Sequence, residues 1–402
     1  MTLHKSQSSK DFLQEQTEFS LVQGGPLFQL LRRSHLSGDD LELMRLRIIV
    51  ISLFAWMPLL VLSTLEGNAL GGNVAVPFLL DVEVNLRFLL ALPLLIAAEL
   101  VVHRRMRFVV LQFFERNLIP EGAMKRFDAA IASTLRLRNS VLAEVLLIVL
   151  VYIVGFLLWR QQYQLDTATW HASPTAEGLK LSLSGMWFAW VSLPIFQFLL
   201  IRWLFRIVIW ARFLWKVSRI NLSLVPTHPD RVGGLGFLSN TVYAFIPLAV
   251  MAGVILSGSI ANRIFHLGAK LPEFTILIGT YVGALLCVVL SPLMVFAPQL
   301  AQAKRVGVRE YGALAERYVS EFDAKWLRGG APADEQLVGS ADIQSLADLA
   351  NSYEVVKTMR IAPVTREVIL RLVVATLVPV GPLVLTIMPL EELLKLLFGK
   401  LI

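Results

Sequence analysis

Long apolar stretches alternate with polar, charged segments along the whole chain. About seven of these stretches approach or exceed the roughly 20 residues that a helix needs to cross the hydrocarbon core of a bilayer. Transmembrane β-strands would give short segments of alternating character, whereas these runs are long and continuous. The pattern therefore predicts an all-α fold, a polytopic bundle of transmembrane helices. The expected spans are residues 46–65, 84–102, 140–159, 181–205, 237–260, 273–297 and 367–388.

The polar segments divide the chain into four parts. Residues 1–45 precede the spans, and residues 46–297 hold the first six spans with amphipathic segments at 103–139 and 206–236. Residues 298–366 are expected to form a helical hairpin, because apolar positions recur at helical spacing on both sides of Gly329 and Gly330. This hairpin either covers the mouth of the bundle or serves as a gate or a docking surface. Residues 367–402 give the last span and a short helix that lies at the membrane interface or re-enters the bilayer.

Composition and charge support a membrane protein with a defined orientation. Hydrophobic residues make up 56% of the chain and charged residues 17%, against about 25% in soluble domains. Lys and Arg gather in the segments 103–139, 206–236 and 298–366, and they are sparse in the intervening loops. Basic loops remain cytoplasmic, so the N-terminus is expected inside and the C-terminus outside. The net charge of +7 is explained by this topology, and no nucleic-acid partner is expected.

Ionisable residues inside the spans are the first candidates for function, because a charge in the bilayer is costly and is often retained for a purpose. Glu99, Glu144, Arg202 and Arg371 all fall near the cytoplasmic ends of their spans, and Arg87 falls near an outer end. The four inner residues are expected to form one polar layer. That layer is either a vestibule for an ion or a charged solute, or a set of structural ion pairs and side chains that reach the interface.

The most unusual polar segment is the HPD loop, residues 226–236, which leads into the fifth span. It contains His228, Asp230 and Arg231 between two prolines and three glycines, which predicts a tight, ordered turn. His228 and Asp230 are too few to hold a metal by themselves, and the Lys-Ser/Thr ending of a phosphate-binding loop is missing. The loop is either a binding site or a structural turn in which Asp230 accepts backbone N–H bonds.

No catalytic chemistry can be recognised in the sequence. The histidines are scattered, and paired metal-ligand spacing and a nucleophile–base pair are absent from the pattern. The single cysteine, Cys287, lies within an apolar run and excludes a disulfide within the chain. The sequence therefore predicts neither an enzyme, nor a cofactor, nor a metal centre.

Two segments carry a resemblance to other proteins. The stretch THPDRVGGLGFLS at residues 227–239 and the stretch SADIQSLADLANSYEVVKTMR at residues 340–360 resemble a group of uncharacterised bacterial multi-pass membrane proteins. The resemblance implies a bacterial inner-membrane location. It brings no activity, ligand or catalytic residue with it.

These observations favour an integral inner-membrane protein that is a channel, transporter or sensor for an ion or small charged solute. The alternative is a membrane anchor or assembly partner that docks another protein through its cytoplasmic helices. The expected partners are the lipid bilayer, a second copy of the chain in a homo-oligomer, and a cytoplasmic protein. An open polar cavity reaching Glu99 and Glu144 would favour the first function, and a closed bundle with an exposed apolar hairpin would favour the second.

Overall fold

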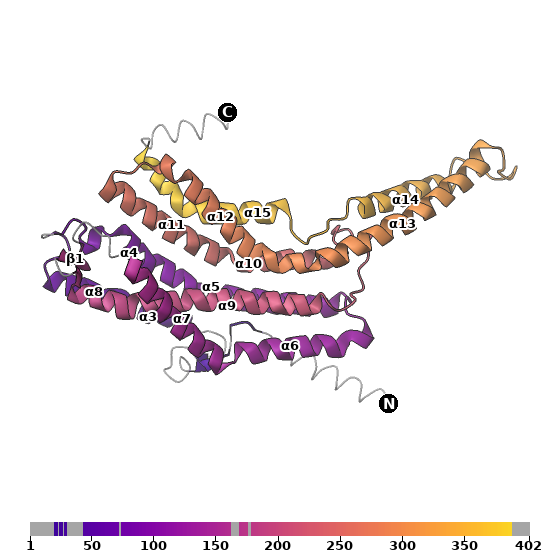
Figure 1. Cartoon of the computed structure of the whole chain (residues 1–402). Helices are drawn as coiled ribbons and strands as arrows, with labels where there is room; N and C mark the ends of the chain where they lie inside the picture. Colours follow the sequence, from indigo (N-terminus) through magenta and orange to yellow (C-terminus); the bar gives the residue numbers. More distant parts are fainter. Residues whose placement is uncertain are drawn as a thin grey trace.

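The computed structural model describes residues 20–22, 24–26, 28–29, 43–71, 74–161, 169–175 and 178–387. Within these residues the fold is all-α, as the sequence predicts, with a small hairpin of two strands, β1 (Ala172–Thr175) and β2 (Gly178–Leu181). Most helices follow one long axis, and a helical hairpin projects beyond the others (Figure 1). The helix expected at 389–402 and most of segment 1–45 lie outside the described residues.

Six helical stretches of the described chain are long and apolar enough to cross a membrane. They correspond to six of the seven expected spans, although 181–205 begins two residues earlier and 367–388 ends two residues later than the matching stretch. The remaining span, 140–159, corresponds to α7 (Val141–Gln161), of which Val141–Ile153 forms a shorter apolar helix among the described residues. The six stretches are α3 (Met44–Leu65); α4 (Val82–Leu86), η2 (Arg87–Ala91) and α5 (Leu92–Glu115); α8 (Leu183–Trp187), η5 (Phe188–Ser192) and α9 (Leu193–Val217); η6 (Leu235–Leu238), α10 (Ser239–Ala244) and α11 (Ile246–Leu267); η7 (Leu271–Phe274), α12 (Thr275–Leu290), η8 (Ser291–Phe296), α13 (Ala297–Phe322) and η9 (Asp323–Leu327); and α15 (Arg366–Leu377) with η10 (Val378–Thr386).

Two spans continue as helices well past their expected ends. Of the expected amphipathic segments, 103–139 begins with the continuation of α5 to Glu115, and 206–236 begins with the continuation of α9 to Val217. The separate helix is α6 (Met124–Arg138), which packs against α9. Aromatic packing explains the extension, because Phe127 of α6 lies with its ring centroid 5.7 Å from that of Phe113 and 5.9 Å from that of Phe213.

The two ends of the bundle differ in chemistry. We call the end at which α5 and α9 finish the basic end, because residues 104–138, 206–231 and 304–366 there are rich in Lys and Arg. We call the other end, which carries β1 and β2, the strand end (Figure 1). At the basic end α13 packs along α14 (Ala341–Lys357) to form the hairpin that projects from the bundle.

The second and third stretches have the same internal construction. Each begins with a five-residue α-helix, continues with a five-residue π-helix, η2 or η5, and then resumes as a long α-helix. The second residue of each long helix is a proline, Pro93 or Pro194. A proline has no N–H for the carbonyl four residues earlier, and a π-helical turn is one way to accommodate that loss. Phe88 and Phe188 make an edge-to-face contact between these π-helices, with ring centroids 6.2 Å apart.

Asp81 organises the strand end. Its carboxylate accepts hydrogen bonds from the Val84 amide at 3.1 Å, from Trp170 Nε1 at 2.9 Å and from Asn262 Nδ2 at 2.8 Å. These donors come from α4, from the segment before β1 and from α11, respectively. A buried carboxylate satisfied in this way joins three distant segments of the chain.

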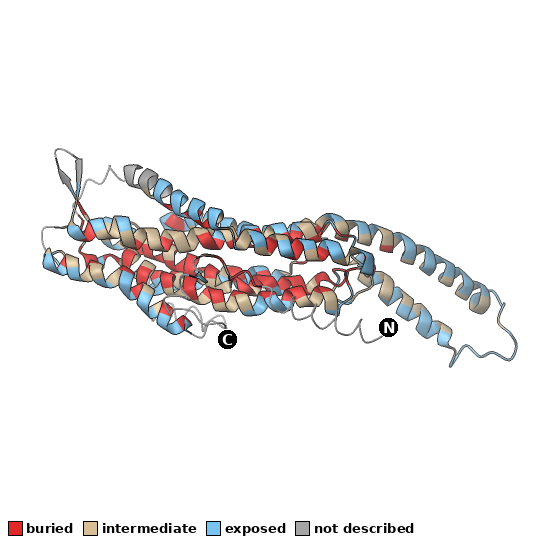
Figure 2. Ribbon diagram, turned by 90° about the horizontal axis from the view of Figure 1, so that it is seen from below, coloured by how far each residue is buried: buried red, intermediate tan, exposed pale blue. Residues whose placement is uncertain are grey.

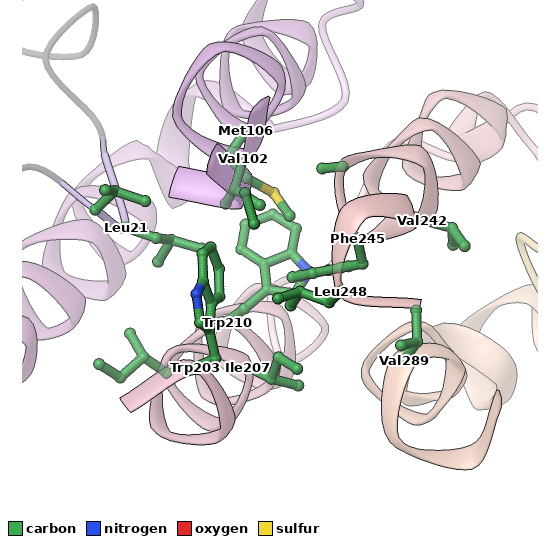
Figure 3. Close-up of a cluster of buried hydrophobic side chains, with 14 of the residues drawn as sticks. Leu21, Val102, Met106, Trp203, Ile207, Trp210, Val242, Phe245, Leu248 and Val289 are labelled. Carbon is green, nitrogen blue, oxygen red and sulfur yellow. The ribbon is translucent and has the colours of Figure 1, made fainter. Parts of the chain in front are cut away.

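The hydrophobic core runs along the middle of the bundle, and the projecting hairpin is largely exposed (Figure 2). In the basic half, side chains of α5, α9 and α11 gather around Trp203 and Trp210, and Val242 of α10 and Val289 of α12 lie farther from the two indoles (Figure 3). Trp203 is fixed by a hydrogen bond of 2.9 Å from its Nε1 to the carbonyl oxygen of Leu95. This core holds α9 beside α5 and thereby positions the charged residues described next.

Candidate functional site

Five ionisable side chains from four helices form one buried charged cluster: Arg47, Glu99, Glu144, Arg202 and Arg206. Glu99 lies at its centre and is paired with Arg47, with Arg206 Nη1 at 2.8 Å and with Arg202 Nη1 at 3.5 Å. Arg202 also donates through Nη2 to Glu144 Oε1 at 3.2 Å. Each of these side chains is at most 10% exposed. The cluster thus ties α3, α5, α7 and α9 together.

Helix geometry explains how the cluster assembles. Arg202 and Arg206 are four residues apart, so both point from the same face of α9. Arg47 and Glu144 are each the fourth residue of their helices, α3 and α7. Removing charges from water costs several kcal/mol per ion unless each finds partners. Every member of the cluster has such a partner within the described chain.

The cluster is closed. The void beside Glu144, Arg202 and Arg206 has a volume of about 10 Å³, which is room for about one water molecule. The segment around Gly24 and Arg138 completes its wall. Glu99 lines neither this void nor the large apolar cavity between α7, α9, α11 and α12.

Arg138 ties the N-terminal segment to this region from the basic end. Its guanidinium donates to the carbonyl oxygen of Ser20 at 2.5 Å. Burial, and to a smaller degree the nearby Arg206, lowers the pKa of Arg138 to about 10. The residue therefore stays charged at neutral pH and adds positive charge to the wall of the void.

The membership of the cluster differs from the expected polar layer. Arg371 does not join it, because its guanidinium pairs with Glu367 on its own helix, lies 5.0 Å from the ring centroid of Tyr243 and is 56% exposed. Two members, Arg47 and Arg206, were missed in the sequence. Arg206 had a recognisable signal, because a second arginine one helical turn after Arg202 must share its face. Arg47 lies at the beginning of its span and was hidden among the basic residues that precede it.

Asp230 organises the HPD loop from within. Its Oδ1 accepts the amides of Val232 at 2.9 Å and Gly234 at 3.2 Å, and its Oδ2 accepts the amide of Gly236 at 2.8 Å. His228 Nδ1 lies 2.9 Å from Oδ1. Burial acts to raise the pKa of Asp230, but these backbone donors together with His228 hold it below its usual value. The carboxylate is used by the loop itself, as the structural interpretation requires.

Two glycines of the loop allow close packing. Gly233 and Gly234 have φ of 65° and 97°, values that L side chains rarely adopt. A Cβ at Gly233 would lie 3.2 Å from Cε of Met359, and one at Gly234 would lie 3.2 Å from Leu118. The loop therefore lies directly against the end of α14 and against the segment after α5.

The HPD loop also binds the end of the α13–α14 hairpin that lies nearest the bundle, which we call the root of the hairpin. The backbone amide of Arg360 donates to the carbonyl oxygen of Arg231 at 2.7 Å. The guanidinium of Arg360 donates to the backbone carbonyl oxygen of Asp230 at 3.0 Å. On α13, a Cβ at Gly307 would lie 2.6 Å from Pro226 and 3.0 Å from Val356, so that only glycine fits. The loop, predicted as a tight and ordered turn, is thus packed against the hairpin.

Arg231 lies apart from the charged cluster. Its side chain is exposed and its φ is 56°. The carboxylates of Glu99 and Glu144 are paired with arginines of α3 and α9. Its backbone carbonyl, which accepts from Arg360, is the part of the residue that holds the loop to the hairpin.

Comparison with known proteins adds no assignment. No protein-family model matches the chain, and neither does any curated protein or solved structure. Within the described residues, no group of three or more His, Cys, Asp or Glu side chains is arranged to hold a metal ion. The site is therefore characterised by its own geometry, a closed ionic cluster and a loop that fixes a hairpin.

The Glu99→Gln variant tests the charged cluster. Removing the central carboxylate leaves Arg47 and Arg206 buried without it, so we expect a loss of about 3–5 kcal/mol in the free energy of unfolding. The control is Glu367→Gln, which removes an exposed pair within one helix and should cost less than about 0.5 kcal/mol. Unfolding of both variants in detergent provides the measurement, and equal losses would contradict the central role of Glu99.

The Asp230→Ala variant tests the HPD loop. Loss of its three backbone acceptor bonds should lower stability by about 0.5–2 kcal/mol, as for a lost helix cap. The variant His228→Ala and the exposed control Asp334→Ala should change the free energy of unfolding little. The hydrogen bonds are accepted by the ionised carboxylate, whose pKa in the folded protein is below the usual value of 3.8. The contribution of Asp230 to stability is therefore fully present above pH 3.8 and declines only at lower pH. A ligand that raises the melting temperature of the wild type but not of His228→Ala would instead identify a binding site.

Proposed function

We propose that this protein is an inner-membrane anchor of a bacterium that docks another protein on the cytoplasmic side through the α13–α14 hairpin. The supporting observation is the contrast between the two ends of the hairpin. Its root is fixed to the HPD loop by the hydrogen bonds of Arg360 and by close packing at Gly307. Its tip carries exposed apolar side chains that nothing in the described chain covers. A rigid arm with an apolar tip is suited to bind a partner.

The exposure of the tip is substantial. Val338 is 89% exposed and Leu327 69%, and Leu337 and Ile343 are also exposed. Apolar groups gathered at one exposed place are typical of protein interaction sites. Two helices packed only on each other leave their outer faces open, and the side chains between α13 and α14 are mostly half-buried. A partner with an apolar groove would complete this packing.

The bilayer is a poor candidate to cover the tip. The 26 residues of α13 correspond to about 39 Å of helix, and the hairpin runs past the basic end of the bundle (Figure 1). The tip is therefore displaced along the bundle axis, beyond the helices that meet lipid. A protein in the aqueous phase is the occupant that this position favours.

Transport or sensing of an ion or small charged solute is a second candidate function. The charged cluster favours it, since five ionisable side chains in one layer of a membrane bundle are costly to keep. The water-sized void at Glu144 is the place where such a solute would first be admitted. Admission of anything larger than water requires α7 or the segment around Gly24 to move.

Reporter fusions test the orientation on which the proposal depends. The basic segments at residues 104–138, 206–231 and 304–366 should remain in the cytoplasm. A fusion at Gly330 should therefore be active with a cytoplasmic reporter, and a fusion at Gly71 with a periplasmic reporter. The reverse pattern would place the hairpin outside and would exclude a cytoplasmic partner.

Site-specific photocrosslinking in cells tests the docking arm. A photoreactive side chain at Val338 should give a covalent adduct with a different protein, because this apolar tip is the proposed contact. The same group at Glu354, an exposed position near the other end of α14, is the control and should give far less adduct. Leu337→Asp should abolish the Val338 adduct while leaving the melting temperature unchanged. An adduct between two copies of the chain, or none, would contradict the proposal.

A further inference from the structure

A large apolar cavity lies apart from both the charged cluster and the HPD loop. Its volume is about 1080 Å³, at the upper end of the range for small-molecule pockets, and residues of α7, α9, α11 and α12 line it. Several lining side chains are themselves exposed: Tyr152 by 47%, Trp190 by 64%, Leu204 by 46% and Val288 by 39%. These residues belong to membrane-spanning helices, so the cavity opens sideways toward the hydrocarbon of the bilayer.

Most polar groups of the lining lie in one part of the cavity. Arg87, His171, Gln197 and Tyr281 contribute polar groups in the part nearer the strand end. The part nearer the basic end is apolar and is lined by Trp203, Leu204, Ile207, Leu248 and Val289. A ligand matched to this lining has a polar group at one end and a hydrocarbon part at the other.

Gln197 shows that the cavity is more than a lipid-facing surface. Its side-chain carbonyl oxygen is buried and accepts no hydrogen bond within the described chain. A Cβ at Gly155 of α7 would lie 3.5 Å from that oxygen, so α7 packs against the oxygen there without a side chain, and a donor in the cavity reaches it once α7 shifts slightly. A buried acceptor without a donor is unfavourable by about 1–3 kcal/mol, which a ligand with an O–H or N–H group would relieve.

The polar part of the cavity carries little net charge. Arg87 is paired with Glu83, four residues earlier on the same stretch. Burial lowers the pKa of His171, against the attraction of Asp81, so its imidazole is neutral at neutral pH. An anionic headgroup would find no unpaired cation among these residues, and a headgroup without net charge is favoured.

The length of the cavity suits a long hydrocarbon chain. On α9 and η5 its lining extends from Phe188 to Ile207, which at 1.5 Å per residue is about 28 Å. The hydrocarbon core is about 30 Å thick and is shared by two leaflets, so the cavity is longer than one leaflet and has room for a whole acyl chain. The surrounding bilayer supplies molecules of this shape to any lateral opening.

We infer that the cavity is a binding site for one membrane lipid without net headgroup charge. Its hydrocarbon chain lies along α9 toward Ile207 and Val289. Its polar group lies among Arg87, His171 and Gln197, where a donor of the lipid satisfies the Gln197 carbonyl. This site is independent of the hairpin, so its failure would leave the docking proposal untouched.

Native mass spectrometry of the full-length protein tests this site. The protein is exchanged into nanodiscs of phosphatidylethanolamine and phosphatidylglycerol at equal amounts, and the lipid that remains bound after release is identified. We expect one retained phosphatidylethanolamine, the net-neutral lipid, in preference to the anionic phosphatidylglycerol. Ala284→Trp places an indole in the cavity and should lower retention at least about tenfold, because the indole occupies space that the lipid chain needs.

Two further variants separate binding from folding. Gly279→Trp places the same side chain on α12 at an exposed position with open space around it, and it should leave retention unchanged. Gln197→Leu keeps the volume but removes the amide, and it should weaken retention while preserving the melting temperature. Equal retention in all variants, no retained lipid in the wild type, a preference for phosphatidylglycerol, or a dimer that Ala284→Trp dissociates would overturn the inference.

Discussion

The requirement that charge inside a bilayer be neutralised governs the rest of this structure. Glu99 could not remain ionised among apolar helices without Arg47 and Arg206 beside it. Because these partners come from different helices, their pairing fixes the rotation of α3, α5 and α9 about their axes. Arg202 extends the constraint to α7 through Glu144. Apolar packing alone would allow these helices several rotations, since lipid and Leu side chains are similarly apolar.

The HPD loop transmits this fixed arrangement to the projecting hairpin. Asp230 folds the loop, and Arg360 joins it to the end of α14. Arg116, just beyond α5, donates to the carbonyl oxygen of Gly234 at 3.2 Å and so joins the same loop to the bundle. The hairpin is thus connected to the membrane helices by defined bonds on several sides, which is the property that a docking arm needs.

The sequence predicted the parts that depend on local chemistry. Hydropathy gave the helical bundle, and glycines at Gly329 and Gly330 marked the turn of the hairpin. Glu99, Glu144 and Arg202 were identified as a layer because each is a charge within an apolar run. Arg371 was misplaced because depth along a span says nothing about which face a residue occupies. The cavity was not foreseen, since it depends on how far α7 and α12 stand apart, and no single residue records that distance.

The paired π-helices have a mechanical consequence. In η2 and η5 the regular ladder of backbone hydrogen bonds is interrupted at neighbouring places in two adjacent helices, just before Pro93 and Pro194. Bending stiffness in a helix comes largely from that ladder, so both helices are softest at one common level. This common level lies between the ionic cluster and the Asp81 network. A bend of these two helices there would tilt the Asp81 network relative to the ionic cluster without breaking the ion pairs of Glu99.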